Sequence, residues 1–280
     1  MKINIIGGGA MGIALSYFLG ERNDVSLIVR EGTATQYRNV EAIYKGKRAR
    51  VKADVREEIE DADLSIIAVK SYDLGDVLQG DLRGDVIFIQ NGLSHLKIRK
   101  RGIRKFYAVT TIAARTVERG VSEITGMGYF RIGGEGTLDL SFLRESGINA
   151  EWAEDIVQEL YRKAGINAVI NPITSIFNVK NKTVMEDENL MRIAFAAVEE
   201  LDALFRKLGY YLELEENVKE TCRVTGENTS SMLQDLVAGR RTEIDAITGE
   251  ILALADEVNV HMPVNSFLYN AIKFLEKNHG

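Results

Sequence analysis

The chain has few residues that could form a disulfide or bind a transition metal. Cys222 is the only cysteine among 280 residues, which excludes internal disulfides and a thiolate zinc site. The three histidines, His95, His261 and His279, are scattered, which argues against a histidine-based metal site or a catalytic triad. We therefore expect no metal, and any proton chemistry has to use a lysine or a carboxylate.

The sequence also lacks a membrane-length apolar run and an excess of positive charge. The apolar stretch Ile3–Gly20 could be mistaken for a signal peptide, but four glycines interrupt it and no small-residue cleavage site precedes Glu21. We expect a cytoplasmic protein that does not bind membranes. A net charge of -6 argues against a nucleic-acid partner, and we interpret the basic run Lys97–Lys105 as a solvated surface. Whether the protein forms a homodimer stays open.

The first motif is a glycine turn between an expected strand, Lys2–Ile6, and an expected helix that starts near Ile13. The turn contains the spacing G-x-G-x-x-G. In this spacing the first glycine permits a tight turn, the second lets the backbone approach a pyrophosphate, and the third allows close helix–strand packing. The context predicts dinucleotide binding. The candidate cofactor-binding residues of this turn are Gly7, Gly8, Gly9, Ala10, Met11 and Gly12.

The end of the next expected strand, Asp24–Val29, bears on the choice of cofactor. Arg30 stands there, where NAD-binding proteins commonly have an acidic side chain for the ribose hydroxyls. An arginine suits the extra phosphate of NADP through its charge and its forked donors. We favour NADP (NADPH), and NAD remains an alternative because Glu31 follows directly.

Polar clusters follow two further apolar runs, Leu64–Val69 and Val86–Ile89. Near-continuous apolar runs are typical of strands buried on both faces of a parallel sheet. Open α/β sheets bind ligands at the carboxyl ends of their strands. The clusters around Lys70 and Asn91 are therefore candidates for ligand contacts. Downstream, Val121–Gly134 has the pattern of a β-hairpin that turns at two glycines.

From about Ala153 the strand patterns give way to amphipathic helical patterns. We therefore predict an α/β fold, with an N-terminal Rossmann-type doubly wound parallel sheet in residues 1–153 and an all-helical C-terminal domain in residues 154–280. The expected helices are Asp155–Val169, Glu188–Leu208, Leu214–Gln234, Thr242–Val258 and Asn265–Asn278.

One polar stripe stands out in the first of these helices. Lys163, Asn167 and Asn171 recur at i, i+4 and i+8, so they lie along one side of the helix among apolar neighbours. A cation and two neutral amides suit a small ligand that has a carbonyl and a hydroxyl, although a solvated helix face has the same spacing. Pro172 follows Asn171 and predicts a local irregularity.

Ser231 and Glu243 form a second candidate pair. They would lie about 18 Å apart on one unbroken helix, too far to contact one small ligand. Gly239–Arg241 interrupts the helical pattern, and Thr242 is a plausible N-cap for the next helix. Two helices that meet at this turn could bring both residues to one pocket. Otherwise Ser231 is a surface serine and Glu243 a first-turn acid that stabilises a helix dipole.

These motifs together resemble the ketopantoate reductases (2-dehydropantoate 2-reductases), over nearly the full length of the chain. Six strings carry the resemblance, and the last two of them are long and unusual. The strings are GGGAMG at Gly7, AVKSYD around Lys70, QNGL around Asn91, TTIAAR at Thr110, YRKAGINAVINPITSIFN from Tyr161 and ENTSSMLQDLVAGRRTEID from Glu227.

The resemblance implies reduction of 2-dehydropantoate to D-pantoate with NADPH, a step of pantothenate and coenzyme A biosynthesis. It implies that Lys163 is the proton donor and that Glu243 lies close to the reacting centre. The other implied cofactor-binding positions are Arg30, Lys70, Asn91, Ala114 and Glu243. The implied substrate-binding positions are Asn91, Lys163, Asn167, Asn171, Asn181 and Ser231. Lys180 and Lys182 make the loop around Asn181 more basic than the resemblance leads us to expect.

With an ordinary pKa of about 10.4, Lys163 would be charged at neutral pH and could polarise a ketone and protonate the developing alkoxide. Glu243 would keep it charged and aimed. Two alternatives remain. A related reductase could act on another 2-keto acid, since the fold does not fix the substrate. A non-catalytic NADP-binding sensor is the other, and the pair of Lys163 and Glu243 argues against it.

Overall fold

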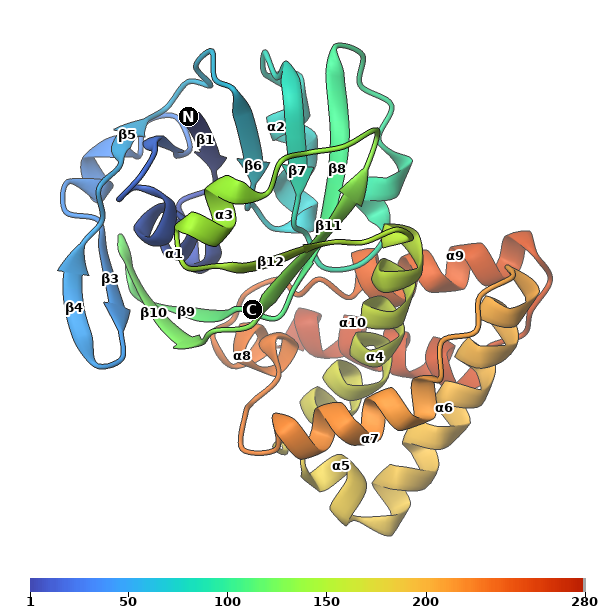
Figure 1. The fold of residues 1–280 in the computed structure, drawn as a ribbon. Coiled ribbons are helices and arrows are strands. Elements are labelled where there is room, and N and C mark those ends of the chain that lie inside the picture. The colour runs from blue at the N-terminus through green and yellow to red at the C-terminus, as the bar shows by residue number, and fades with distance from the viewer. Residues whose placement is uncertain (279–280) are drawn as a thin grey trace. The chain divides into compact units, whose positions relative to one another are not determined.

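The computed structural model describes residues 1–278 and divides into two compact units. Unit 1 comprises Met1–Gln90 and Ile98–Glu159, and unit 2 comprises Asn91–Lys97 together with the chain from Leu160 onward. Figure 1 shows the strands gathered in the first unit and the long helices in the second. The short segment Asn91–Lys97 thus belongs with the helices, although its neighbours in the sequence are strands.

Unit 1 is built on an eight-stranded sheet with the order β12-β11-β8-β7-β6-β1-β2-β5. All neighbouring strands are parallel except β8 and β11, which pair antiparallel. The prediction of a parallel α/β sheet is therefore confirmed. The strands are β1 (Lys2–Ile6), β2 (Asp24–Ile28), β5 (Asp54–Arg56), β6 (Leu64–Ile67), β7 (Gly84–Phe88), β8 (Ile103–Thr110), β11 (Tyr129–Gly134) and β12 (Asn149–Trp152).

Both faces of this sheet carry apolar side chains. Successive residues of a strand point to opposite faces, so neighbouring apolar residues enter different clusters. Ile5 packs in one core cluster with Leu15, and Ile6 packs in another cluster with Leu74. Leu15 and Leu74 come from two different helices, so helices cover the sheet on both sides, which is the doubly wound arrangement. The helices and 3₁₀ turns of this unit are α1 (Ala10–Leu19), η1 (Ala34–Tyr37), η2 (Ser71–Asp73), α2 (Leu74–Gln79) and α3 (Ser141–Glu145).

A second, four-stranded sheet in unit 1 has the order β4-β3-β10-β9. Its strands are β3 (Glu41–Tyr44), β4 (Lys47–Arg50), β9 (Ala113–Glu118) and β10 (Val121–Gly126). The predicted hairpin over Val121–Gly134 is wrong, because β10 pairs in this sheet whereas β11 pairs with β8 and β12 in the main sheet. Gly128 lies in the connection, where a Cβ would come within 2.1 Å of Oγ1 of Thr111. That glycine permits a close approach and does not make a hairpin turn.

Unit 2 contains only helices and turns among its described residues. They are η3 (Ser94–Lys97), α4 (Ile156–Phe177), which begins in unit 1, α5 (Thr183–Glu186), α6 (Glu188–Lys207), α7 (Leu214–Val224), α8 (Ser231–Val237), the π-helical turn η4 (Asp245–Gly249), α9 (Glu250–Glu257) and α10 (Pro263–Asn278). None of the described helices is both long and apolar enough to cross a lipid bilayer.

Three helix predictions need correction. The predicted helix Leu214–Gln234 is two helices, because α8 has its own N-cap at Ser230. The predicted helix Thr242–Val258 begins with a π-helical turn before α9. Finally, α4 continues through Pro172 to Phe177, so the proline removes only one backbone donor and does not end the helix.

Candidate active site

The glycine turn of unit 1 lies where β1 ends and α1 begins, and its glycines serve two purposes. Gly7 has φ +123°, and a Cβ at Gly12 would lie 1.8 Å from the carbonyl oxygen of Gly7, so the protein's own backbone requires both. At Gly9, the N-cap of α1, a Cβ would meet no described atom within 4 Å. That open space faces a helix N-terminus without acidic residues in its first turn, and it fits a phosphate group.

Arg30 follows the end of β2 by two residues and Lys70 follows the end of β6 by three, and both strands flank β1 in the sheet. These positions therefore lie at the carboxyl edge that the glycine turn also occupies. Arg30 Nη2 is 3.2 Å from Oδ1 of Asp73, and 73% of the arginine side chain is exposed. Such an exposed ion pair is weak, so the guanidinium keeps donors for a phosphate. These residues fit a dinucleotide.

Ala114, another expected cofactor residue, lies in β9 of the small sheet. It pairs with Ile124 of β10 and packs on the core cluster that α1 also enters. Ser122 of β10 donates from Oγ to the carbonyl oxygen of Ala10, at 2.8 Å. The small sheet is thus attached to the first residue of the helix that follows the glycine turn.

In unit 2, the segment Asn91–Lys97 lies along the chain that carries Glu243. Asn91 Nδ2 donates to Oε2 of Glu243 at 3.1 Å, and the backbone N–H of Leu93 donates to the carbonyl oxygen of Ala246 at 2.9 Å. Gly92 has φ +84°, and a Cβ there would lie 2.1 Å from the same carbonyl oxygen. Only glycine permits this approach.

Lys163 stands in the third turn of α4 and is electrostatically coupled to Glu243. Burial lowers the pKa of Lys163 to about 8, and the negative charge of Glu243 opposes this effect. The expectation of an ordinary lysine pKa is therefore wrong. At pH 7 a group with this pKa is still protonated by about ten to one, so the ammonium remains available as an acid.

His95 is a residue near this site that the sequence analysis missed. It lies in η3 and has no exposed surface. Burial, together with the positive charge of Lys163, lowers the pKa of His95 to about 3, so the imidazole is neutral. The signal in the sequence is its position four residues after Asn91, in the same loop. Because His95 lies far from the other two histidines in the sequence, the sequence analysis did not consider it a site residue.

The stripe on α4 leads towards the start of α8. Asn171 is buried, with 6% exposure, and Thr174 lies one turn further along the helix. Oγ1 of Thr174 is 2.7 Å from Oγ of Ser230, which also accepts from the backbone N–H of Leu233 as the N-cap of α8. Ser231, the first residue of α8, is exposed. This contact joins the helix of the stripe to the helix of Ser231.

Asn181 is buried and holds two loops together. Its Nδ2 donates to Oγ1 of Thr225 at 2.9 Å, and within residues 1–278 its Oδ1 has no hydrogen-bond partner. Lys180 and Lys182, which flank it, both lie 2.6 Å from carboxylate oxygens of Glu227. Hydrogen bonds from these lysines lower the pKa of Glu227 to about 2. The single carboxylate of Glu227 thus compensates part of the extra basic charge, and Asn181 retains a buried acceptor.

The chain is similar to known proteins over nearly its whole length. A family model described as ketopantoate reductase PanE/ApbA matches residues 3–135, and the model of its C-terminal part matches residues 155–276. The 2-dehydropantoate 2-reductase of Archaeoglobus fulgidus is 32% identical, over 98% of both chains. The chain belongs to the ketopantoate reductase family. The 2-dehydropantoate 2-reductase of Bacillus subtilis is 30% identical, over 99% of this chain and 98% of its own.

Two solved structures extend the comparison of this family member. A probable 2-dehydropantoate 2-reductase from Bacillus subtilis is 27% identical, with a TM-score of 0.86 over 98% of this chain and 100% of its own. D-mandelate dehydrogenase, solved with NADH and anilino(oxo)acetate, is 26% identical, with a TM-score of 0.91 over 100% of this chain and 99% of its own. This family member is thus a dinucleotide-binding oxidoreductase by relationship.

Proposed function

We propose that this protein reduces 2-dehydropantoate to D-pantoate with NADPH, in the synthesis of pantothenate and coenzyme A. The observation that supports this most is Lys163, a mostly buried cation whose charged form the nearby Glu243 stabilises. A buried, protonated lysine is suited to deliver a proton to a carbonyl oxygen as it becomes an alkoxide. The similarity to curated 2-dehydropantoate 2-reductases over the whole chain supports the same substrate.

NADPH, when bound, supplies the hydride that reduces the keto carbon. The ammonium of Lys163 polarises the ketone and then gives a proton to its oxygen. Glu243 stabilises the charged form of Lys163, and Asn91 donates to the Glu243 carboxylate and so restrains it. The neutral His95 adds no second positive charge next to Lys163, which would otherwise lower the lysine pKa further.

The remaining polar residues of unit 2 would bind the substrate through its carboxylate and hydroxyl groups. Amides and hydroxyls suit this role because they can either donate or accept. Asn181 supports the proposal with a buried Oδ1 that can accept from a hydroxyl. The proposed substrate-binding residues are Asn91, Lys163, Asn167, Asn171, Asn181 and Ser231.

In unit 1, the glycine turn would bind the pyrophosphate and Arg30 the additional phosphate of NADPH. The exposed guanidinium supports this assignment, since it has donors that the weak pair with Asp73 does not use. The proposed cofactor-binding residues are Gly7, Gly8, Gly9, Ala10, Met11, Gly12, Arg30, Lys70, Asn91, Ala114 and Glu243.

A second candidate is reduction of another 2-keto acid, with NADH. The similarity to D-mandelate dehydrogenase favours it. The experiment that separates the two measures kcat/KM with purified protein for 2-dehydropantoate and for phenylglyoxylate, the keto acid formed by oxidation of D-mandelate, each with NADPH and with NADH. The proposal expects 2-dehydropantoate with NADPH to give the largest value. A larger value for phenylglyoxylate would favour the second candidate.

A further inference from the structure

One face of α10 is bonded to the chain segment that carries Glu243. Tyr269, Lys273 and Glu276 are spaced i, i+4 and i+7, so they lie on one side of the helix. Oε1 of Glu276 accepts from the backbone N–H of Thr242 at 2.8 Å and from its Oγ1 at 2.7 Å. Tyr269 donates its hydroxyl to Oδ1 of Asp245 at 2.8 Å, and Nζ of Lys273 donates to Oδ2 at 3.0 Å.

Glu243 lies between the two anchored residues. Thr242 directly precedes it, and Oγ1 of Thr242 also accepts from the backbone N–H of Ile244, at 3.2 Å. Asp245 follows two residues later and begins the π-helical turn. The Glu243 side chain itself is only 6% exposed. The contacts of α10 therefore fix the backbone on both sides of this buried carboxylate.

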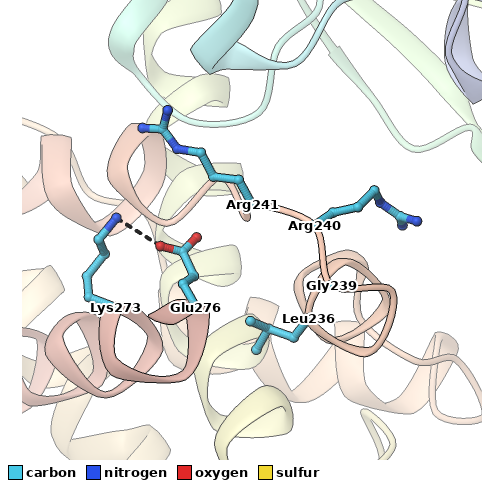
Figure 2. Close-up of a pocket in the computed structure, with 6 residues that line it drawn as sticks. All are labelled: Leu236, Gly239, Arg240, Arg241, Lys273 and Glu276. Atoms are coloured by element: carbon cyan, nitrogen blue, oxygen red, sulfur yellow. Dashed lines mark ion pairs between the residues drawn. The ribbon is translucent and has the colours of Figure 1, made fainter. Parts of the chain in front are cut away.

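Packing alone does not hold the segment in front of Glu243. Gly239, Arg240 and Arg241 are exposed, and together with Lys273 and Glu276 they line a pocket of about 300 Å³ (Figure 2). Figure 2 shows the two arginine side chains pointing away from each other, while Lys273 reaches toward Glu276. Close-packed side chains do not fill this space, so hydrogen bonds and the ion pairs of Arg240 with Asp235 and of Arg241 with Asp245 hold the residues before Glu243. On the other side of Glu243, Ile244 is buried in a core cluster with Ile272 of α10.

The Glu276 carboxylate is suited to this task because it is ionised. Burial acts to raise the pKa of Glu276, but hydrogen bonds from Lys273 and Thr242 outweigh burial and lower the pKa. The second oxygen, Oε2, is 2.8 Å from Nζ of Lys273. An ionised carboxylate accepts stronger hydrogen bonds than a neutral group does.

We propose that Glu276 is a positioning residue. Its hydrogen bonds to Thr242 orient the carboxylate of Glu243 towards Lys163. The inference rests on the proposed function, in which Lys163 is the proton donor. One charged residue near Lys163 acts on its pKa, and a neighbouring imidazole carries no charge. Glu243 stabilises the ammonium, and His95 is neutral beside it. If Glu243 moves away, Lys163 loses the charge that opposes its burial, and its pKa falls.

The experiment is a titration of Lys163 by NMR in protein labelled with ¹³C at the lysine ε-carbons, without cofactor or substrate. The Lys163 signal is assigned by its absence in Lys163→Arg. In Glu276→Ala we expect its pKa to fall by about half a unit to one unit, a part of the effect that an opposite charge at contact distance has. Glu276→Gln keeps an oxygen that can accept from Thr242, so its shift should be smaller. An unchanged Lys163 pKa in folded Glu276→Ala would overturn the inference.

Two further variants distinguish a loss of Glu243 positioning from a general loss of stability. Glu257→Ala removes an exposed carboxylate from α9 and should leave the Lys163 titration unchanged. If Glu276→Ala does not fold, Thr242→Val takes its place, since it removes one of the two hydrogen bonds to Glu276. It should shift the pKa in the same direction, and no shift would again contradict the inference.

Activity then distinguishes this inference from the proposed function. If the wild-type protein reduces 2-dehydropantoate, the alkaline limb of kcat/KM should move in Glu276→Ala by the amount seen in the titration. Loss of folded protein would lower the rate at every pH and would not move this limb. Absence of turnover in the wild type would contradict the proposed function, while the titration would still decide the inference.

Discussion

Asn91 donates a hydrogen bond of 3.1 Å to the carboxylate of Glu243, although 152 residues separate them in the sequence. Both belong to unit 2, because the segment Asn91–Lys97 packs there and not with the strands that precede it. Glu243 in turn acts on the pKa of Lys163. The amide, the carboxylate and the ammonium thus form one connected set, and their coupling leads to a prediction for pH dependence.

The rate of ketone reduction should fall as the pH rises past the pKa of Lys163, because only the ammonium can donate the proton. Burial lowers that pKa to about 8, so the alkaline limb of kcat/KM should lie near this value and not near that of an exposed lysine. Glu243→Gln removes the charge that opposes burial, and the limb should move to lower pH by about one unit. Rate–pH profiles of both proteins check this. A limb that stays in place would show that Glu243 does not act on Lys163.

Arg30→Ala should weaken the binding of NADPH much more than that of NADH, because only NADPH carries the additional phosphate. Loss of a charged hydrogen bond costs about 1.5–3 kcal/mol, or roughly 10- to 100-fold in Kd. Fluorescence titration with each nucleotide measures the difference. The matched control is Arg22→Ala. Arg22 is also exposed, but it precedes β2, whereas Arg30 follows β2. Equal losses for the two nucleotides would show that Arg30 does not bind the phosphate.

Two glycine variants separate folding from cofactor binding. Gly12→Ala places a methyl group 1.8 Å from the carbonyl oxygen of Gly7 and should destabilise the protein by roughly 3 kcal/mol or more. Gly9→Ala meets no described atom within 4 Å, so it should change stability by less than about 0.5 kcal/mol. The new methyl group would stand where the pyrophosphate approaches, and NADPH binding should weaken by about tenfold or more. Urea unfolding and nucleotide titration check both; normal NADPH binding by Gly9→Ala would contradict the assignment of this turn.

His95 should make the protein sensitive to acid. Burial keeps the pKa of His95 at about 3 in the folded protein, whereas an unfolded histidine titrates near its ordinary value of 6.5. The unfolded chain therefore takes up a proton first, and stability falls as the pH drops below 6.5. Between pH 7 and pH 5 this contributes a loss of about 2 kcal/mol. His95→Gln removes the titration, so the free energy of unfolding should depend less on pH. An equal pH dependence in both proteins would show that folding does not lower the pKa of His95.

Local patterns were sufficient to predict the sheet and the glycine turn. The run Leu64–Ile67 is buried on both faces, and the residues around Gly9 follow the spacing that a strand–turn–helix unit requires. The hairpin prediction failed because Gly126 and Gly128 look the same in the sequence whether the chain reverses or passes between two sheets. Which sheet a strand joins depends on contacts far away in the sequence, such as that of Gly128 with Thr111.

The site residues were predicted in different ways. The i, i+4 spacing on α4 placed Lys163 and Asn171 on one stripe directly, since spacing fixes the face of a helix. The contact of Asn91 with Glu243 and the burial of His95 could not be predicted, because they depend on the segment Asn91–Lys97 packing with the helical unit. The lowered pKa of Lys163 has the same origin, since burial and the position of Glu243 are tertiary properties.

The most direct test of the account compares wild-type protein with Lys163→Ala, using NADPH and 2-dehydropantoate and following the loss of nicotinamide absorbance. The wild type should turn over, and Lys163→Ala should lower kcat by roughly 10²–10⁴-fold, the usual contribution of a general acid, with little change in NADPH affinity. Near-normal kcat in Lys163→Ala would contradict the central claim, because the proton would then come from another group.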